Sequence, residues 1–153
     1  MMDTQKLTLL ELADHETACE FPPGFNHRAL MKKVEELKPK LNSIAGKPFE
    51  LDVNVQDASF FTELAILEPP IYGVNMYHYV LGVRFSSFGN FFTVWSNSIK
   101  EKIDDTKIDE IISETEEAGF VYIDAETLEQ KYTGRNKYLA DIENWWARYF
   151  DYL

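Results

Sequence analysis

Histidine and cysteine are the side chains of this sequence best suited to bind a metal or act as a nucleophile, and they are few. His15 and Cys19 are four residues apart and stand among acidic residues. Zinc requires four ligands in tetrahedral geometry, and the other histidines, His27 and His78, extend no ligand pattern. A cysteine nucleophile would also need a neighbouring base and an oxyanion site. We therefore predict no metal site, no cofactor and no catalytic residue.

Catalytic motifs are also missing from the sequence. It contains no GxGxxG, Walker A loop, HExxH, GxSxG or CxxC pattern. The single cysteine allows no disulfide within the chain, which favours a reducing compartment, and we expect a cytoplasmic protein. The first residues resemble no signal peptide, and no apolar run is long enough to span a membrane, so no membrane association is expected.

The acidic residues are concentrated in one part of the chain. The net charge is −11, and residues 100–130 contain eleven acidic residues against three lysines, which places −8 there. Residues 26–50 carry a small positive excess. Nucleic-acid binding requires lysine and arginine to neutralise phosphates, so this balance argues against it. Such asymmetry favours steering of a cationic protein partner, although a solvated helix face that keeps the protein soluble is the alternative explanation.

A protein-binding surface is the first functional hypothesis. The acidic stretch predicts a helix from Asp104 or Asp105 to Ala118, whose carboxylates would attract a basic partner. Aromatic side chains beside charge serve as anchors at protein interfaces, and an aromatic residue at a hairpin tip is expected to be exposed. The predicted partner-binding residues are Asp105, Asp109, Glu110, Glu114, Glu117 and Phe88.

A small-ligand or enzymatic site is the alternative hypothesis. A pocket between the sheet and a helix would place polar groups around a ligand, and a histidine in such a pocket would have a shifted pKa. The candidate residues are His78, Arg84, Asp52 and Asn54. A satisfied core histidine and a solvated sheet face explain the same residues equally well. A third possibility is a structural subunit, so the chain is expected to be a monomer or a homodimer.

The segment Tyr77–Asn97 is the predicted centre of the fold. Its aromatic and β-branched residues predict two strands, and Ser87–Asn90 supplies the turn between them. Strands are also predicted at 49–56, 60–67 and 120–123, and the aromatic segment Asn144–Leu153 is interpreted as a final strand rather than a helix.

Helical periodicity predicts a helix that Asn26 can cap and that Gly46, followed by Pro48, ends. Leu30, Val34, Leu37, Leu41 and Ile44 recur on one face, and Pro39 predicts a kink or break in this helix. Residues 5–13 predict a short helix or strand, and 15–26 a loop containing Pro-Pro-Gly. Sequential strands joined by short turns predict one α+β domain over 1–153, with an antiparallel sheet around a central aromatic hairpin and helices packed on one face.

The segments VRFSSFGNFFTVWS and NWWARYFDYL, with the size and acidic balance of the chain, resemble small bacterial immunity proteins of polymorphic or contact-dependent toxin systems. The resemblance implies a cytoplasmic inhibitor that binds a toxin domain tightly and blocks its active site or substrate surface. A nuclease toxin would be basic, and an acidic helix could then imitate the phosphates that it binds.

Overall fold

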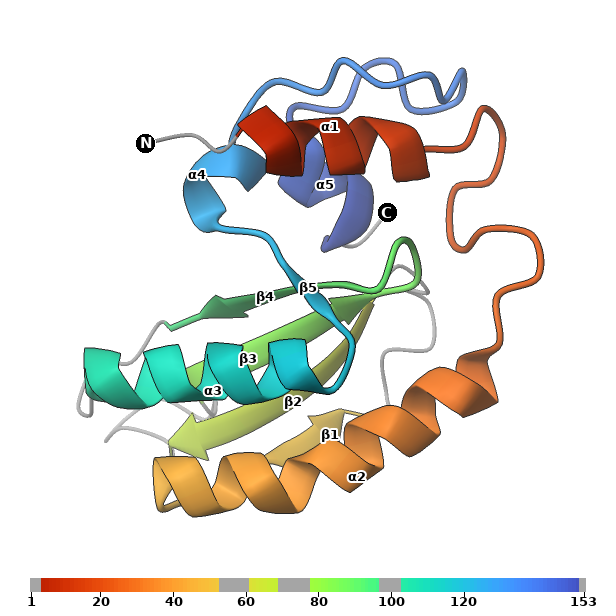
Figure 1. Cartoon of the computed structure of the whole chain (residues 1–153). Coiled ribbons are helices and arrows are strands. Elements are labelled where there is room, and N and C mark those ends of the chain that lie inside the picture. The colour runs from red at the N-terminus through yellow and green to blue at the C-terminus, as the bar shows by residue number, and fades with distance from the viewer. Residues whose placement is uncertain (1–3, 53–60, 69–77, 97–102, 152–153) are drawn as a thin grey trace.

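A five-stranded sheet lies at the centre of the computed structural model, which describes residues 4–52, 61–68, 78–96 and 103–151 (Figure 1). The strands follow one another across the sheet in chain order, and each of the first four is antiparallel to its neighbour. Their bounds are Glu50–Asp52 (β1), Phe61–Glu68 (β2), His78–Ser86 (β3), Phe91–Trp95 (β4) and Val121–Tyr122 (β5). The α+β prediction is confirmed.

The fifth strand departs from the antiparallel pattern, since β5 is parallel to β4. Helix α3, Asp105–Glu117, lies between these two strands in the chain. Two parallel neighbours in a sheet need a crossover connection between them, usually a helix. The acidic helix that the sequence predicts supplies this crossover.

The predicted hairpin of β3 and β4 is confirmed, and its turn explains the sequence at the tip. Gly89 and Asn90 have φ angles of 60° and 55°, and the Phe91 N–H donates to the Phe88 carbonyl at 3.2 Å. Two consecutive positive φ values match the right-handed twist of the strands, and glycine and asparagine tolerate them best.

Helix α2, His27–Ala45, has the caps that the sequence predicts. The Asn26 side chain accepts a hydrogen bond from the Ala29 N–H, and Gly46 ends the helix with φ 71°. The helix continues through Pro39, so the predicted break does not occur. Pro39 is exposed, and the carbonyl that lacks its donor can bind water instead.

Helices α2 and α3 lie side by side on one face of the sheet (Figure 1). The apolar faces of both helices meet the strands in the larger of two hydrophobic cores. Its fully buried side chains include Val34, Leu41, Leu64, Leu81, Val83, Phe85, Phe92 and Ile111.

The remaining helices form a second layer beyond the hairpin turn: α1 (Thr4–Ala13), α4 (Ala125–Leu128) and α5 (Trp145–Tyr149) (Figure 1). A second hydrophobic core joins them to the hairpin. The hairpin belongs to both cores, because Phe85 and Phe92 pack in the first, whereas Phe88 and Phe91 pack in the second.

The interpretation of Asn144–Leu153 as a strand is wrong, because Trp145–Tyr149 is a helix. Asn144 caps it by accepting a hydrogen bond from the Ala147 N–H at 2.9 Å. Helical spacing places Trp145 and Tyr149 on one face, where their rings stack at 5.8 Å in the second core. In a strand, the side chains of Arg148 and Tyr149 would point to opposite faces, whereas the helix buries both completely.

Candidate functional site

Helix α3 presents a buried stripe and an acidic outer surface. Asp104 caps the helix by accepting from the Thr106 N–H at 2.9 Å. Ile111 and Thr115 are fully buried against the rest of the fold, and the Thr115 hydroxyl donates to the Ile111 carbonyl at 2.7 Å. The side chains on the opposite side of the helix therefore face solvent.

Five carboxylates of α3 are exposed, and none pairs with a lysine or arginine among the described residues. We call this set the acidic face: Asp105, Asp109, Glu110, Glu116 and Glu117. Four of the five predicted carboxylates belong to it. The fifth, Glu114, is partly buried and forms an ion pair with Lys40 of α2 at 3.7 Å. Glu114 therefore contacts α2 at the edge of the acidic face, and this partly exposed pair adds little to stability.

Tyr122 of β5 lies beside the acidic face, although the sequence did not single it out. Its half-buried ring packs 5.5 Å from the Phe92 ring. Burial raises the pKa of the Tyr122 phenol above its ordinary value, and the negative charges of Asp124, Asp109 and Glu116 raise it further. Carboxylates from α3 and from the start of α4 thus act together on one aromatic side chain.

Neutralising Asp109 and Glu116 should lower the pKa of Tyr122 toward its ordinary value of 10.0. Two of the charges that disfavour the phenolate would be gone, whereas its burial would remain. The measurement is an NMR titration of ring-labelled tyrosine in the Asp109→Asn, Glu116→Gln protein. Glu35→Gln with Glu36→Gln on α2 is the control with the same charge change. An unchanged titration in the first variant would show that these carboxylates do not act on Tyr122.

Phe88 does not serve as an exposed anchor, and that prediction is wrong. Only 1% of Phe88 is exposed. Its ring lies 5.4 Å from the Tyr149 ring and 4.5 Å from the Arg148 guanidinium carbon, both on α5. The second layer of helices covers the hairpin tip, so the aromatic residue at the turn is part of a core.

The alternative ligand pocket does not form around Arg84. This arginine donates to Glu63 at 2.5 Å and to the Phe150 carbonyl at 2.6 Å, and its guanidinium lies over three aromatic rings: Phe61, Trp95 and Trp146. These partners lie on the sheet face opposite α2 and α3, and the predicted location between sheet and helix is filled by the first core. Asp52 and His78 lie at the ends of β1 and β3, and Asn54 lies outside the described residues.

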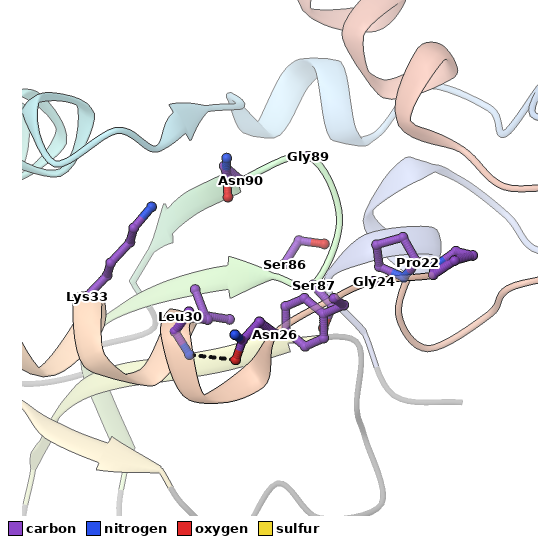
Figure 2. A pocket seen from close by; sticks show the side chains of 12 residues that line it. Pro22, Gly24, Asn26, Leu30, Lys33, Ser86, Ser87, Gly89 and Asn90 are labelled. Atoms are coloured by element: carbon purple, nitrogen blue, oxygen red, sulfur yellow. Dashed lines mark hydrogen bonds between the residues drawn. The ribbon is translucent and has the colours of Figure 1, made fainter.

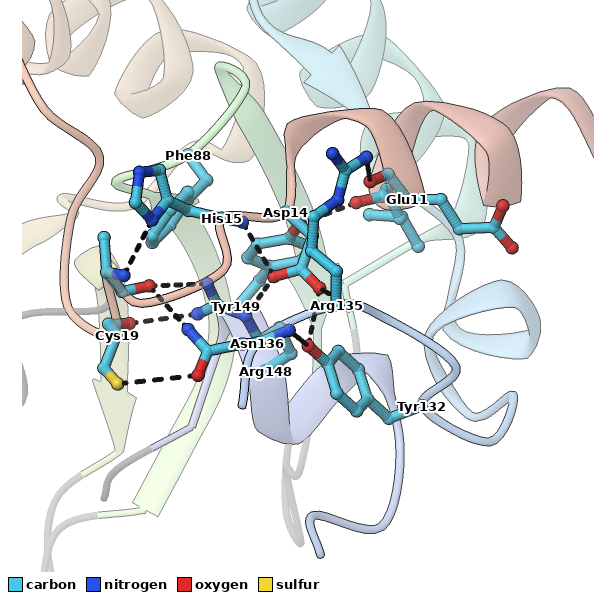
Figure 3. A network of polar contacts seen from close by, with 12 residues as sticks. Glu11, Asp14, His15, Cys19, Phe88, Tyr132, Arg135, Asn136, Arg148 and Tyr149 are labelled. Atoms are coloured by element: carbon cyan, nitrogen blue, oxygen red, sulfur yellow. Dashed lines mark hydrogen bonds and ion pairs between the residues drawn. The ribbon is translucent and has the colours of Figure 1, made fainter. Parts of the chain in front are cut away.

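A buried polar network that no sequence pattern indicates joins α1, α5 and the loop between α4 and α5 (Figure 3). Asp14 Oδ1 accepts from Arg148 Nε at 2.7 Å, and both side chains are fully buried. Asp14 Oδ2 accepts from the Tyr132 hydroxyl at 2.5 Å and from the Arg135 N–H at 2.8 Å. The remaining Arg148 nitrogens donate to the carbonyls of Ala18 and Cys19.

This network is satisfied by partners within the protein. Burial and the hydrogen bond to Asp14 raise the pKa of Tyr132 to about 12. The phenol therefore stays protonated and donates at neutral pH. The His15 side chain also contributes to the structure of the loop after α1, since its Nδ1 accepts from the N–H groups of Thr17 and Ala18. Among the described residues, no three histidine, cysteine or acidic side chains are placed to hold a metal ion.

Comparisons with protein-family models, with curated proteins and with solved structures return no match. Within the ranges that the structure describes, no helix has the length and apolar character needed to cross a bilayer.

Proposed function

We propose that this chain is a non-enzymatic protein-binding domain, an immunity-type inhibitor that neutralises a cognate toxin in the cytoplasm by binding a basic surface on it. The observation that carries the proposal is the acidic face of α3, where five exposed carboxylates lack cationic partners among the described residues. A basic partner would supply those missing counter-charges.

Electrostatics explains why such a face favours binding. Like charges on neighbouring turns of a helix repel one another, and an approaching cationic surface relieves this repulsion. The long-range attraction mainly raises the rate of association, and salt weakens it. A toxin that acts on nucleic acid has a basic substrate surface, and the carboxylates of α3 would occupy it in place of phosphates.

The test begins with affinity capture from the native host at low and high salt, followed by association kinetics with the purified partner. The variant Asp109→Asn, Glu110→Gln, Glu117→Gln should associate about tenfold more slowly at low salt, with a weaker salt dependence. The control is Glu20→Gln, Glu35→Gln, Glu36→Gln, which removes the same charge from exposed positions outside α3.

Only the position of the neutralised carboxylates differs between these two variants. Equal slowing in both would assign the effect to net charge and would remove α3 from the interface. An unchanged rate and salt dependence in the α3 variant would contradict the proposal. So would the absence of any protein partner at either salt concentration.

A further inference from the structure

A pocket of about 330 Å³ opens between α2, the turn of the β3–β4 hairpin and the loop before α2 (Figure 2). None of its lining residues belongs to α3, so it is separate from the acidic face. The volume lies at the lower end of the range found for small-molecule sites. Apolar groups of Pro22, Pro23, Phe25 and Leu30 line one part of it.

The polar part of this pocket offers hydrogen-bond donors and one positive charge. Lys33 contributes its ammonium group, which lies 5.9 Å from the centre of the Phe120 ring. Among the described residues no carboxylate pairs with Lys33. No acidic side chain of the described part of the chain lines the pocket, although the chain carries a net charge of −11.

Two further polar side chains line the pocket without using their full hydrogen-bonding capacity. Ser86 is 3% exposed, and its oxygen accepts from the Phe88 N–H at 3.1 Å. Its own hydroxyl proton has no acceptor in the described structure, and neither has the Asn90 side-chain amide. The Asn26 side chain already caps the first turn of α2, where its Oδ1 accepts from the Ala29 N–H at 3.0 Å.

We infer that this pocket binds a small organic anion, with an apolar body against Phe25 and Leu30 and a carboxylate or phosphate group that accepts from Lys33, Ser86 and Asn90. Burial of the apolar body against these side chains stabilises the complex, and the lysine supplies a charge-assisted hydrogen bond. The two oxyanion types share this chemistry, and their relative affinities distinguish them.

The test uses the full chain labelled with ¹⁵N and three probes: phenyl phosphate, benzoate and the neutral benzyl alcohol. At least one anion should shift the amide signals of Gly89, Asn90 and Ala29 with a dissociation constant on the order of 1 mM. Benzyl alcohol should bind about tenfold more weakly, because it lacks the charge that Lys33 recognises.

Two variants and a control locate the site. Lys33→Gln should weaken anion binding about tenfold, and Ala29→Leu should reduce it by filling the pocket. Lys32→Gln removes the same charge from an exposed neighbouring position that does not line the pocket, and it should leave affinity unchanged. Three results would overturn the inference: no saturable shift, equal affinity for the neutral probe, or equal affinity in Lys33→Gln. Because these measurements involve no protein partner, they are independent of the proposed inhibitor function.

Discussion

Replacement of Arg148 by methionine should lower the free energy of unfolding by about 3–5 kcal/mol. The Arg148 guanidinium is the cation beside Asp14, and both side chains are fully buried. Methionine fills a similar volume but leaves the Asp14 carboxylate without a counter-charge in the protein interior. The carbonyls of Ala18 and Cys19 also lose their donors. Chemical denaturation measured by circular dichroism gives the free energy directly.

Two comparisons separate the loss of charge from the loss of contacts. Arg135→Met removes an exposed guanidinium from the same region and should change stability by less than about 0.5 kcal/mol. Asp14→Leu combined with Arg148→Met removes both buried charges and should be more stable than Arg148→Met alone. If Arg148→Met proves as stable as Arg135→Met, this ion pair is not buried in solution.

Arg84→Met should lower the free energy of unfolding by a similar amount, about 3–5 kcal/mol, because it removes the cation that pairs with the buried Glu63. Glu63 is 1% exposed, and its Oε2 also accepts from the Trp95 indole N–H at 2.7 Å. The β2 and β3 strands place Glu63 directly opposite Arg84, so the pair belongs to the sheet itself. The change is measured by denaturation followed through tryptophan fluorescence.

The shape of the guanidinium contributes to this site as well as its charge. Arg84→Lys keeps the positive charge but cannot donate to both Glu63 and the Phe150 carbonyl while stacking on rings. The stability of Arg84→Lys should therefore lie between that of the wild type and that of Arg84→Met. Arg28→Met on the exposed surface of α2 is the control. Adding Glu63→Gln to Arg84→Met should restore part of the stability, and a further loss would contradict the role given to the buried charge.

Local signals in the sequence predicted those parts of the fold that depend on neighbouring residues. The cap at Asn26, the stop at Gly46 and the turn at Gly89–Asn90 require particular residue types within a few positions, and all three are confirmed. The predicted acidic helix forms as α3, and four of its five predicted carboxylates are exposed, whereas Glu114 is partly buried. Helical periodicity also outweighed the disruptive effect of Pro39.

Contacts between distant parts of the chain decided the features that the sequence left unpredicted. Phe88 is buried because Tyr149, sixty-one positions later, packs against it. The segment Asn144–Leu153 fits a strand or a helix when only its apolar spacing is considered, and its partners in the second core favour the helix. No pattern in a single sequence joins Asp14 to Arg148, because any arginine could have been the partner.

The Asp14–Arg148 contact spans 134 positions, which has a consequence for the order in which the protein is made. Helix α1 leaves the ribosome before α5, and the partners that bury Asp14 and Leu10 are synthesised more than a hundred residues after them. Such long-range contacts slow folding, since a large loop must close before they form. During translation, helix α1 and the Asp14 carboxylate therefore remain exposed to water until α5 has been synthesised, and the second core forms last.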